Sequence, residues 1–307
     1  MQKRFAKSLK IIINHINKLM NVNINNYYGN KRITTALLLA AGTGSRLYPL
    51  TQNSPKCLTL VNEKSILERL VINLKQQGFK RLVIVTGYLE NNIREVLGTK
   101  SGNMTIEYIY SPLYKTTNNI YSLWMARERI NEPFILVESD LVFDVSLLDD
   151  MIYPDRIAVA HMQPWMNGTT VTINKSQQIK SFQNGTTDHL DENKYKTVNI
   201  YSFSLSSWHA IVERLNQYIS AGKVNYYYET ILAEMVEEGN LSLQAVSFDR
   251  KPWYEIDTIN DLAEAEKIIH ADINKTGVLE NILSLTSDIS INFTEKIKYL
   301  EPQEIAG

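Results

Sequence analysis

The chain has 307 residues, with 32 Lys and Arg against 33 Asp and Glu, and a formal net charge of −1 at pH 7. Its 44% hydrophobic and 21% charged residues are typical of a globular protein, and its length allows one large α/β domain with appended segments. The balanced charge argues against a general nucleic-acid surface, and the single cysteine, Cys57, excludes an internal disulfide and a cysteine-based metal site.

Residues 1–34 form a basic segment that contains lysines and arginines but no Asp or Glu. Apolar side chains recur at helical spacing over residues 5–20, which predicts a helix. We favour a helix packed on its own domain or on a second copy in a homo-oligomer over a membrane-surface helix. No apolar run approaches the roughly 20 residues of a membrane span, and the N-terminus is a poor signal peptide. We therefore expect no stable membrane insertion and a cytoplasmic location.

From residue 36 onward, strands and helices alternate. Strands are expected at residues 36–41, 81–86, 104–110 and 133–139, with helices at 65–77, around 93–96 and at 122–129. Gly78 is placed to end the first helix. This alternation predicts an α/β fold with a Rossmann-like, mostly parallel sheet flanked by helices. Ligands of such sheets bind beyond the carboxyl ends of the strands.

A glycine-rich turn, residues 42–45 (GTGS), follows the first strand. Glycines let backbone N–H groups approach a polyphosphate, because they carry no Cβ. Arg46 comes directly after the turn and Lys56 ten residues later, and both would supply positive charge to phosphate oxygens. The turn is neither a Walker A loop nor the dinucleotide fingerprint, whose third glycine is replaced by Leu47.

An aspartate ends the fourth strand. Asp140 follows Glu138 and Ser139 and is expected at the rim of the sheet near the glycine turn. A turn or capping role is the simpler alternative. An Asp that faces a phosphate loop is also how Mg²⁺ is held, by few carboxylates together with substrate phosphates.

After residue 156 the pattern changes to short strands. These are expected at residues 157–161, 168–173, 179–182, 197–204 and 243–248, with helices at 208–220, 227–237 and up to 269. The short strands predict a smaller, β-rich, mixed or antiparallel extension. Residues 272–307 are expected to be a tail or a linker to a further domain.

Two strings resemble the signatures of the nucleotidyltransferases that make NDP-sugars and CDP-alcohols. The first is LAAGTGSR with the later Pro55-Lys56, and the second is WYEIDTINDL, which contains Asp257. The resemblance implies the nucleotidyltransferase fold, with Mg²⁺ held by Asp140 and Asp257, which are 117 positions apart (257 − 140). Asp261 is expected to cap the following helix instead. The implied catalytic residues are Arg46, Lys56, Asp140 and Asp257, and the implied nucleotide-binding residues are Leu39, Ala41, Gly42, Thr43, Gly44, Ser45, Arg46, Lys56, Thr86, Gly87 and Tyr88.

A third string, residues 114–124 (YKTTNNIYSLW), resembles the N-x-I-Y-S motif of bacterial CTP:phosphocholine cytidylyltransferases, and still more the enzymes that activate 2-aminoethylphosphonate. A capped helix start with Asn119 as cap is compatible with it. The implied substrates are CTP and a small amine-bearing phosphonate or phosphate. The acceptor-binding residues expected on this basis are Lys115, Asn118, Tyr121, Asp188, Tyr201 and Glu229.

The implied reaction is transfer of CMP from CTP to 2-aminoethylphosphonate by Mg²⁺-assisted in-line attack, with release of pyrophosphate. Phosphocholine and a sugar 1-phosphate are the alternative acceptors. A quaternary ammonium is usually held by aromatic faces, whereas a primary ammonium also needs hydrogen-bond acceptors. The expected division is a nucleotidyltransferase domain at residues 35–271, with a nucleotide half up to about residue 155 and an acceptor half after it.

Overall fold

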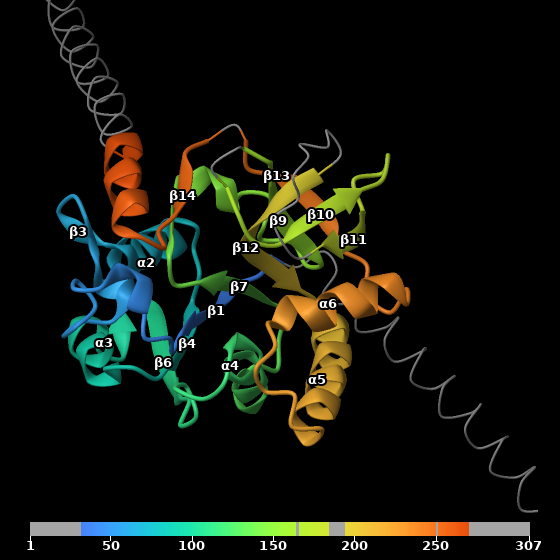
Figure 1. Ribbon diagram of the computed structural model, residues 1–307, viewed down its shortest axis with the longest axis horizontal. Coiled ribbons are helices and arrows are strands. Elements are labelled where there is room, and N and C mark those ends of the chain that lie inside the picture. Colours follow the sequence, from blue (N-terminus) through green and yellow to red (C-terminus); the bar gives the residue numbers. More distant parts are fainter. Residues whose placement is uncertain (1–31, 164–165, 184–193, 250, 270–307) are drawn as a thin grey trace, which may run out of the picture.

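The computed structural model describes residues 32–163, 166–183, 194–249 and 251–269. Ten strands form the main sheet: β1 (Thr35–Ala40), β4 (Arg81–Thr86), β5 (Lys100–Ser101), β6 (Met104–Tyr110), β7 (Phe134–Glu138), β9 (Arg156–His161), β10 (Thr170–Ile173), β11 (Ile179–Gln183), β12 (Lys194–Phe203) and β13 (Gln244–Ser247). Their order is β11-β10-β12-β7-β1-β4-β6-β5, with β9 paired to β12 and β13 paired to β9 (Figure 1).

Helices cover both faces of this sheet. They are α2 (Ile66–Gln76), α3 (Glu90–Leu97), α4 (Asn119–Met125), α5 (Leu205–Ser220) and α6 (Tyr228–Glu237). One core contains residues of α2 and α3, and the core on the opposite face contains residues of α4, α5 and α6. The expected α/β fold with helices flanking a mostly parallel sheet is therefore confirmed.

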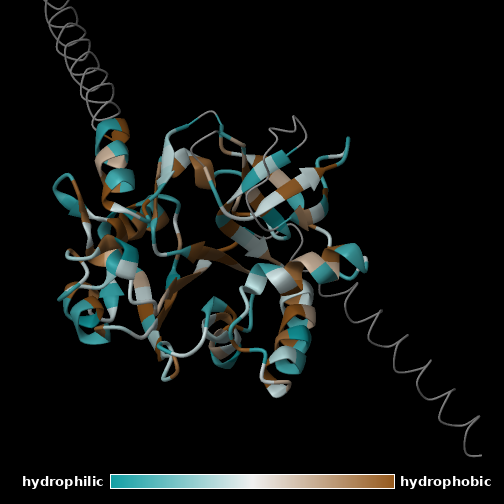
Figure 2. Ribbon diagram, in the orientation of Figure 1, coloured by the Kyte–Doolittle hydropathy of each residue, from teal (hydrophilic) through white to brown (hydrophobic). Residues whose placement is uncertain are grey.

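Strand β1 is the centre of the sheet, with β4 parallel on one side and β7 parallel on the other. All six of its residues are buried. Successive side chains of a strand point to opposite faces, so Leu38 joins one core while Leu37 and Leu39 join the other. A strand buried on both faces reads as a continuous apolar run, which is why the sequence identified it. The hydrophobic ribbons of β1, β4 and β7 lie at the middle of the molecule (Figure 2).

The β-rich extension grows out of the main sheet through β12. The second half of β12 pairs antiparallel with β7, and its first half pairs antiparallel with β10. On its other edge β12 pairs with β9, and this pairing shifts register between Thr197 and Tyr201. Asn199 lies in that interval with a φ of 58°. The predicted antiparallel extension is thus confirmed, as one continuous sheet with the parallel part.

Several boundaries and short elements differ from the sequence expectation. The helix expected at residues 122–129 begins earlier, because α4 is capped by Asn118, whose side chain accepts a hydrogen bond from Asn119 N. The expected cap, Asn119, is the first helical residue. The pairs β2 (Leu60–Val61) with β3 (Lys64–Ser65), and β8 (Leu141–Phe143) with β14 (Trp253–Glu255), were not anticipated. Strands of two or three residues leave no periodic pattern in a sequence.

Residues 259–269 are helical. The Asp261 carboxylate accepts a hydrogen bond from Thr258 N (2.7 Å), and Asp261 N donates to the Thr258 hydroxyl (3.2 Å). This reciprocal pair is a capping box, so the capping role expected of Asp261 is confirmed. The basic segment before residue 32, Asp188 and the region after residue 269 lie outside the described residues.

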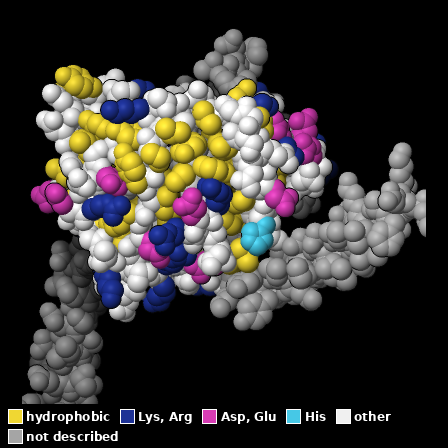
Figure 3. Space-filling view, turned by 90° about the horizontal axis from the view of Figure 1, so that it is seen from below, with side chains coloured by type: hydrophobic (Ala, Val, Ile, Leu, Met, Phe, Trp, Pro, Cys, Tyr) yellow, Lys and Arg dark blue, Asp and Glu magenta, His cyan; other side chains and the backbone are white. Residues whose placement is uncertain are grey.

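One face of the molecule is shown in Figure 3. Apolar side chains form a broad area on it, and a mixed group of acidic and basic side chains lies beside them. Positive and negative side chains are thus interspersed on this face rather than separated. Within the described residues, none of the helices combines the length and apolarity that crossing a membrane requires.

Candidate active site

A pocket of about 680 Å³ opens beyond the carboxyl ends of β1 and β7. In the main sheet, β4 and β6, which follow β1 in sequence, are added on one side of it, whereas β7 is added on the other side. Ligands of open α/β sheets bind at such a switch point in the strand order. The pocket is lined by Leu39, Ala41, Gly42, Thr43, Gly44, Ser45, Arg46, Lys56, Tyr114, Thr117, Asn118, Asn119, Ser122, Glu138, Ser139, Asp140, Asn167, Gly168, Thr169, Lys196, Asn199, Tyr227, Glu229, Glu255 and Asp257. The first eight of these are predicted nucleotide-binding residues, which the fold brings together on one wall.

The glycine turn is shaped by Gly44 and the segment that packs on it. Gly44 has a φ of 62°, and an added Cβ would lie 2.8 Å from the Lys56 Cβ. The Thr51 hydroxyl donates to Gly44 O over 2.9 Å, which fixes the turn against the following loop. Only glycine fits here, because the position needs both a left-handed conformation and close approach of the chain that carries Lys56.

Lys56 lies between the two aspartates of the predicted metal site. Its Nζ is 2.8 Å from Asp140 Oδ2 and 2.7 Å from Asp257 Oδ1. Arg46, which is largely exposed, contacts the same Asp257 oxygen over 2.7 Å. Burial by itself would lower the pKa of Lys56, but the attraction of Asp140 and Asp257 outweighs it and raises that pKa. The ammonium form is therefore favoured, and together with Arg46 it balances the charge of the aspartate pair.

Asp257 reaches Asp140 through a small antiparallel pairing. β14 pairs with β8, and Ile256 N donates to Asp140 O over 2.9 Å. The backbone N–H of Asp257 donates to the Asp261 carboxylate over 3.1 Å, so the capped helix start also fixes this residue. Two residues far apart in the sequence thus line the same pocket and contact the same Lys56 ammonium.

The two aspartates suit a divalent cation such as Mg²⁺. The Oδ1 atom of Asp140 is buried and has no hydrogen-bond partner among the described residues. Such an orphaned oxygen fits a hard cation, which takes oxygen ligands. No cluster of three or more His, Cys, Asp or Glu side chains that could hold a metal occurs within the described part of the chain. Two carboxylates would hold Mg²⁺ only together with substrate phosphates and water.

A second group of charges lies next to the aspartates. The Lys196 side chain is 3% exposed, and its Nζ is 3.0 Å from Glu255 Oε2. The other Glu255 oxygen accepts a hydrogen bond from Asn199 Nδ2 over 3.2 Å. Burial raises the pKa of Glu255, Lys196 opposes that shift, and the nearby Asp140 and Asp257 add to it. The pair therefore places one more cation beside the aspartates of the predicted metal site.

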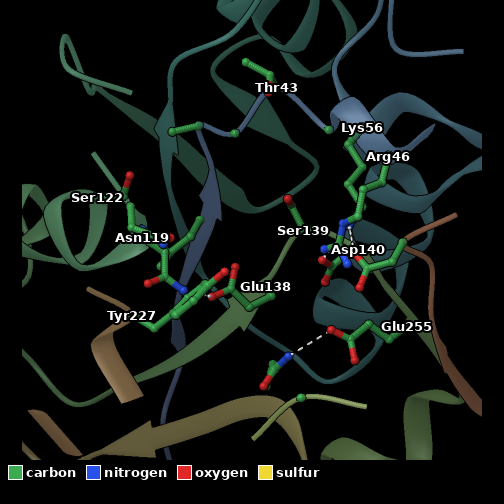
Figure 4. Close-up of a pocket in the computed structure, with 18 of the residues that line it drawn as sticks. Thr43, Arg46, Lys56, Asn119, Ser122, Glu138, Ser139, Asp140, Tyr227 and Glu255 are labelled. Carbon is green, nitrogen blue, oxygen red and sulfur yellow. Dashed lines mark hydrogen bonds and ion pairs between the residues drawn. The ribbon is translucent and has the colours of Figure 1, made fainter. Parts of the chain in front are cut away.

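A third group, at the other end of the pocket, contains carboxylates that form no salt bridge with any residue the structure describes. Figure 4 shows Asn119, Tyr227 and Glu138 across the cavity from Lys56 and Arg46. The Asn119 side-chain amide donates to Glu138 Oε1 over 3.3 Å. Glu229 is 6% exposed, and its Oε2 has no hydrogen-bond partner among the described residues. Burial raises the pKa of Glu229 to about 7.

Six predicted residues do not line the pocket. Thr86 is fully buried behind the glycine turn, and Gly87 packs so tightly that an added Cβ would lie 2.6 Å from Ala41 O. The Tyr88 hydroxyl lies within hydrogen-bond distance of Thr51 O and Gln52 O, so it supports the loop that holds the turn.

The three others were expected on the acceptor side. Tyr201 is fully buried in the core beside Phe203. Tyr121 packs against Trp124, and the Lys115 ammonium lies over the Tyr114 ring. Asn118 and Glu229 do line the pocket.

Several pocket residues were not anticipated as functional, namely Glu138, Glu255, Lys196 and Asn199. The sequence did carry a signal for the first two. Glu138 and Glu255 each stand two positions before an aspartate, and residues i and i+2 of a strand share a face. No local pattern marks Lys196, because its partner Glu255 comes from a distant strand.

Residues 35–272 match the family model of nucleotidyl transferases, so this chain belongs to that family and is an enzyme of the nucleotidyltransferase class. Among its relatives is the CMP-5′-(3-aminopropyl)phosphonate synthase of Streptomyces rubellomurinus, 28% identical over 259 residues, which cover 80% of this chain and 40% of that protein. Choline-phosphate cytidylyltransferase of Streptococcus pneumoniae is 24% identical and matches 76% of this chain and 97% of its own length. CTP:phosphoglutamine cytidylyltransferase of Campylobacter jejuni is 26% identical over 74% of this chain and 97% of its own length.

Solved structures share the fold. CTP:phosphocholine cytidylyltransferase from Streptococcus pneumoniae superimposes with a TM-score of 0.65 at 23% identity, covering 78% of this chain and 99% of that one. The inositol-1-phosphate CTP transferase from T. maritima gives a TM-score of 0.64 at 18% identity, covering 78% of this chain and 96% of that one. The nucleotidyltransferase fold expected from the sequence is therefore confirmed.

Proposed function

We propose that this enzyme transfers CMP from CTP to 2-aminoethylphosphonate and releases pyrophosphate. Support for CTP comes from the relatives, three of which are named for CTP, CMP or cytidylyl chemistry. The observation that carries the acceptor is the pair of pocket carboxylates Glu138 and Glu229. Glu138 accepts a hydrogen bond from the Asn119 side chain, and Glu229 follows Tyr228, whose N–H donates to the same side chain. Neither carboxylate forms a salt bridge with another described residue, so a cationic group of the ligand would complete this end of the pocket.

The form of this end favours a primary ammonium. An ammonium has three N–H donors, and Glu138, Glu229 and the Asn118–Asn119 side chains offer oxygen acceptors around it. A trimethylammonium instead needs several aromatic faces. Among the described lining residues the aromatic ones are Tyr114 and Tyr227, so the pocket offers fewer aromatic faces than polar acceptors. Phosphocholine is therefore the second candidate.

The nucleotide would lie along the glycine turn. Backbone N–H groups of residues 42–45, with Arg46 and Lys56, would hold the β- and γ-phosphates. The base would lie against the end of β1, on the side that Thr86, Gly87 and Tyr88 support from behind. Lys56 would exchange the aspartates for the triphosphate, whose negative charge would favour its ammonium form in the same way.

In the reaction, an acceptor phosphonate oxygen attacks the α-phosphorus of CTP in line. A new P–O bond forms, and the bond from the α-phosphorus to the oxygen shared with the β-phosphorus breaks, so pyrophosphate leaves. No general base is needed, since a phosphoryl dianion with a second pKa of about 6 is already formed near neutrality. Catalysis then consists of positioning and charge neutralisation. A Mg²⁺ ion bound by Asp140 and Asp257 would contribute Lewis-acid charge stabilisation.

The test is pyrophosphate release with CTP and Mg²⁺ in the presence of 2-aminoethylphosphonate, phosphocholine or glucose 1-phosphate at equal concentration. We expect the highest kcat/KM with the aminophosphonate. A preference for phosphocholine would make the second candidate the function, and turnover with glucose 1-phosphate alone would indicate a sugar-nucleotide enzyme. Thermal shift with CTP, UTP, dTTP and ATP, with and without Mg²⁺, tests base choice, because a nucleotide that binds the native state raises its melting temperature.

A further inference from the structure

Lys196 is a buried cation whose ammonium reaches the pocket wall beyond the two aspartates. Its Nζ donates to Thr197 O over 2.7 Å and pairs with Glu255 Oε2 over 3.0 Å. A lysine ammonium has three N–H donors, and no bond to another described residue uses the third. Gly168 forms the wall next to it, and a Cβ added there would lie 3.4 Å from the Lys196 Nζ. The glycine therefore leaves the ammonium uncovered by a side chain.

Lys196 lines the same pocket as the two aspartates and Glu229. Its partner Glu255 ends β14 two positions before Asp257, and the intervening Ile256 N donates to Asp140 O over 2.9 Å. Glu229 follows Tyr228, whose N–H donates to the Asn119 side chain over 3.0 Å. Lys196 thus shares one cavity with the predicted metal site and with the carboxylate that would meet the acceptor's ammonium.

The reaction needs a cation at this place. Of the described lysines and arginines, Arg46, Lys56 and Lys196 line the pocket. Arg46 and Lys56 lie on the glycine-turn side, where the triphosphate would take them. The reaction brings two anions together, the triphosphate and the phosphonate or phosphate of the acceptor. Without Lys196, the described side chains charged at neutral pH that line the rest of the pocket would be carboxylates. Lys115, expected in this role from its sequence position, does not line the pocket.

We propose that Lys196 binds the phosphonate or phosphate group of the acceptor and orients its oxygen toward the nucleotide. This inference rests on the proposed function, and it assigns the two charged ends of the acceptor to different residues. The anionic end belongs to Lys196, and the ammonium end to Glu229 and Glu138.

The test is the steady-state kinetics of Lys196→Met. We expect the KM for 2-aminoethylphosphonate to rise about 10- to 100-fold, the effect of losing one hydrogen bond to a charged group, with the KM for CTP within about twofold of wild type. Methylphosphonate, which lacks the amine, serves as a probe of the anionic end alone. Its Ki as a competitive inhibitor against the acceptor should rise by the same factor. Lys180→Met, at an exposed lysine on β11, is the matched control, and both constants should be unchanged in it.

A purely structural role for Lys196 predicts a different pattern. Lys196→Met leaves Glu255 buried without its partner, so the double variant Lys196→Met/Glu255→Gln removes both charges of the pair. If Lys196 only holds Glu255 in place, the double variant should recover the wild-type KM and Ki, and that result would overturn the proposal. If Lys196 binds the anion, both constants stay raised in the double variant, and Lys196→Arg restores them in part.

The two levels of the argument can fail separately. If the wild-type enzyme releases no pyrophosphate from CTP with any phosphonate or phosphate acceptor, the proposed function is wrong. If the wild-type enzyme turns over and Lys196→Met keeps the wild-type acceptor KM, the cytidylyltransferase assignment stands and the role of Lys196 is refuted.

Discussion

The two ends of the pocket are both built from carboxylates but treat charge in opposite ways. At one end Lys56 contacts Asp140 and Asp257 at 2.8 and 2.7 Å, and attraction to them raises the lysine pKa. At the other end Glu229 is buried with one oxygen unbonded among the described residues, and burial raises its pKa to about 7. The first end carries its own counter-ion. Within the described residues, Glu229 at the second end forms no salt bridge, because the nearby Lys196 pairs with Glu255 instead.

This difference indicates what each end is prepared to bind. A buried carboxylate without a counter-ion costs several kcal/mol, and a ligand cation can offset that cost. At the aspartate end the internal cations must instead change partners, from carboxylates to phosphates, when metal and nucleotide arrive. One end is therefore suited to a metal–triphosphate complex and the other to an ammonium.

The largest loss of activity is expected from removing either aspartate at the Lys56 end of the pocket. We expect Asp140→Ala and Asp257→Ala each to reduce kcat/KM by at least about 1000-fold, since charge stabilisation at the reacting phosphorus is lost. Each variant leaves Lys56 one carboxylate partner, so the protein should still fold. Pyrophosphate release at saturating Mg²⁺ measures the activity and circular dichroism the fold. A wild-type rate in either variant would remove the metal assignment.

Neutralising Glu229 should weaken the second end and leave the first intact. In Glu229→Gln we expect the KM for 2-aminoethylphosphonate to rise about 10- to 100-fold with the KM for CTP unchanged, because one charge-assisted hydrogen bond is lost. Glu237→Gln, an exposed position on the same helix, is the matched control. An equal rise in the KM for CTP would contradict the separation of the two ends.

The pH dependence of acceptor binding gives a finer test of the same carboxylate. Glu138, Lys196 and Glu255 surround Glu229, whose pKa is raised to about 7 by burial. Ionisation on raising the pH through 7 should strengthen the hold on an ammonium, so the acceptor KM should fall between pH 6 and 8. This fall should be smaller in Glu229→Gln than in wild type.

The ionisation of Glu229 should also affect the stability of the fold. Raising the pH should strengthen acceptor binding but lower the free energy of unfolding. A carboxyl whose folded pKa is raised stabilises the fold below its unfolded value of 4.5, and this contribution is lost as the pH rises toward 7. Relative to Glu229→Gln, the free energy of unfolding of wild type should thus decrease by about 3 kcal/mol at most. Urea unfolding at pH 5 and pH 8 measures it, and identical pH dependence in the two proteins would refute an ionisable Glu229.

The smallest effect is expected from removing a hydroxyl group that supports the loop beside the glycine turn. Tyr88→Phe removes a hydroxyl within 3.0 Å of Thr51 O and 2.8 Å of Gln52 O. We expect the KM for CTP to rise about two- to fivefold, the value of one partly exposed hydrogen bond, with no change in the acceptor KM. Tyr110→Phe, at an exposed tyrosine, is the control. A larger effect on the acceptor than on CTP would show that the two ends are not independent.

Most of the parallel sheet could be predicted from the sequence, because buried strands such as β1 and β4 are continuous apolar runs. The glycine turn, Lys56 and the two aspartates could be named for a related reason, since each lies in a short contiguous string with a recognisable chemical pattern. The boundary of α4 was placed late, because the polar residues Asn118 and Asn119 at its start carry no apolar periodicity.

The acceptor side could not be predicted in this way. Tyr201 was expected in the pocket, but it is fully buried in the core. Lys196 and Asn199 of the same strand line the pocket instead. The register shift near Asn199 decides which side chains of this strand line the pocket. That shift occurs in the pairing with β9, a distant segment of the chain.

By itself the sequence determined the class of fold, the nucleotide wall and the two aspartates, because these depend on local patterns of apolar, glycine and charged residues. Only the tertiary structure decided how the charges are distributed. It placed Lys56 between Asp140 and Asp257, paired Lys196 with Glu255, and left Glu229 without a salt bridge among the described residues. The physical reason is that a charged side chain pairs with whichever opposite charge lies near it in space, not near it in the sequence. The partners come from segments more than 50 positions apart, which no local pattern in the sequence connects.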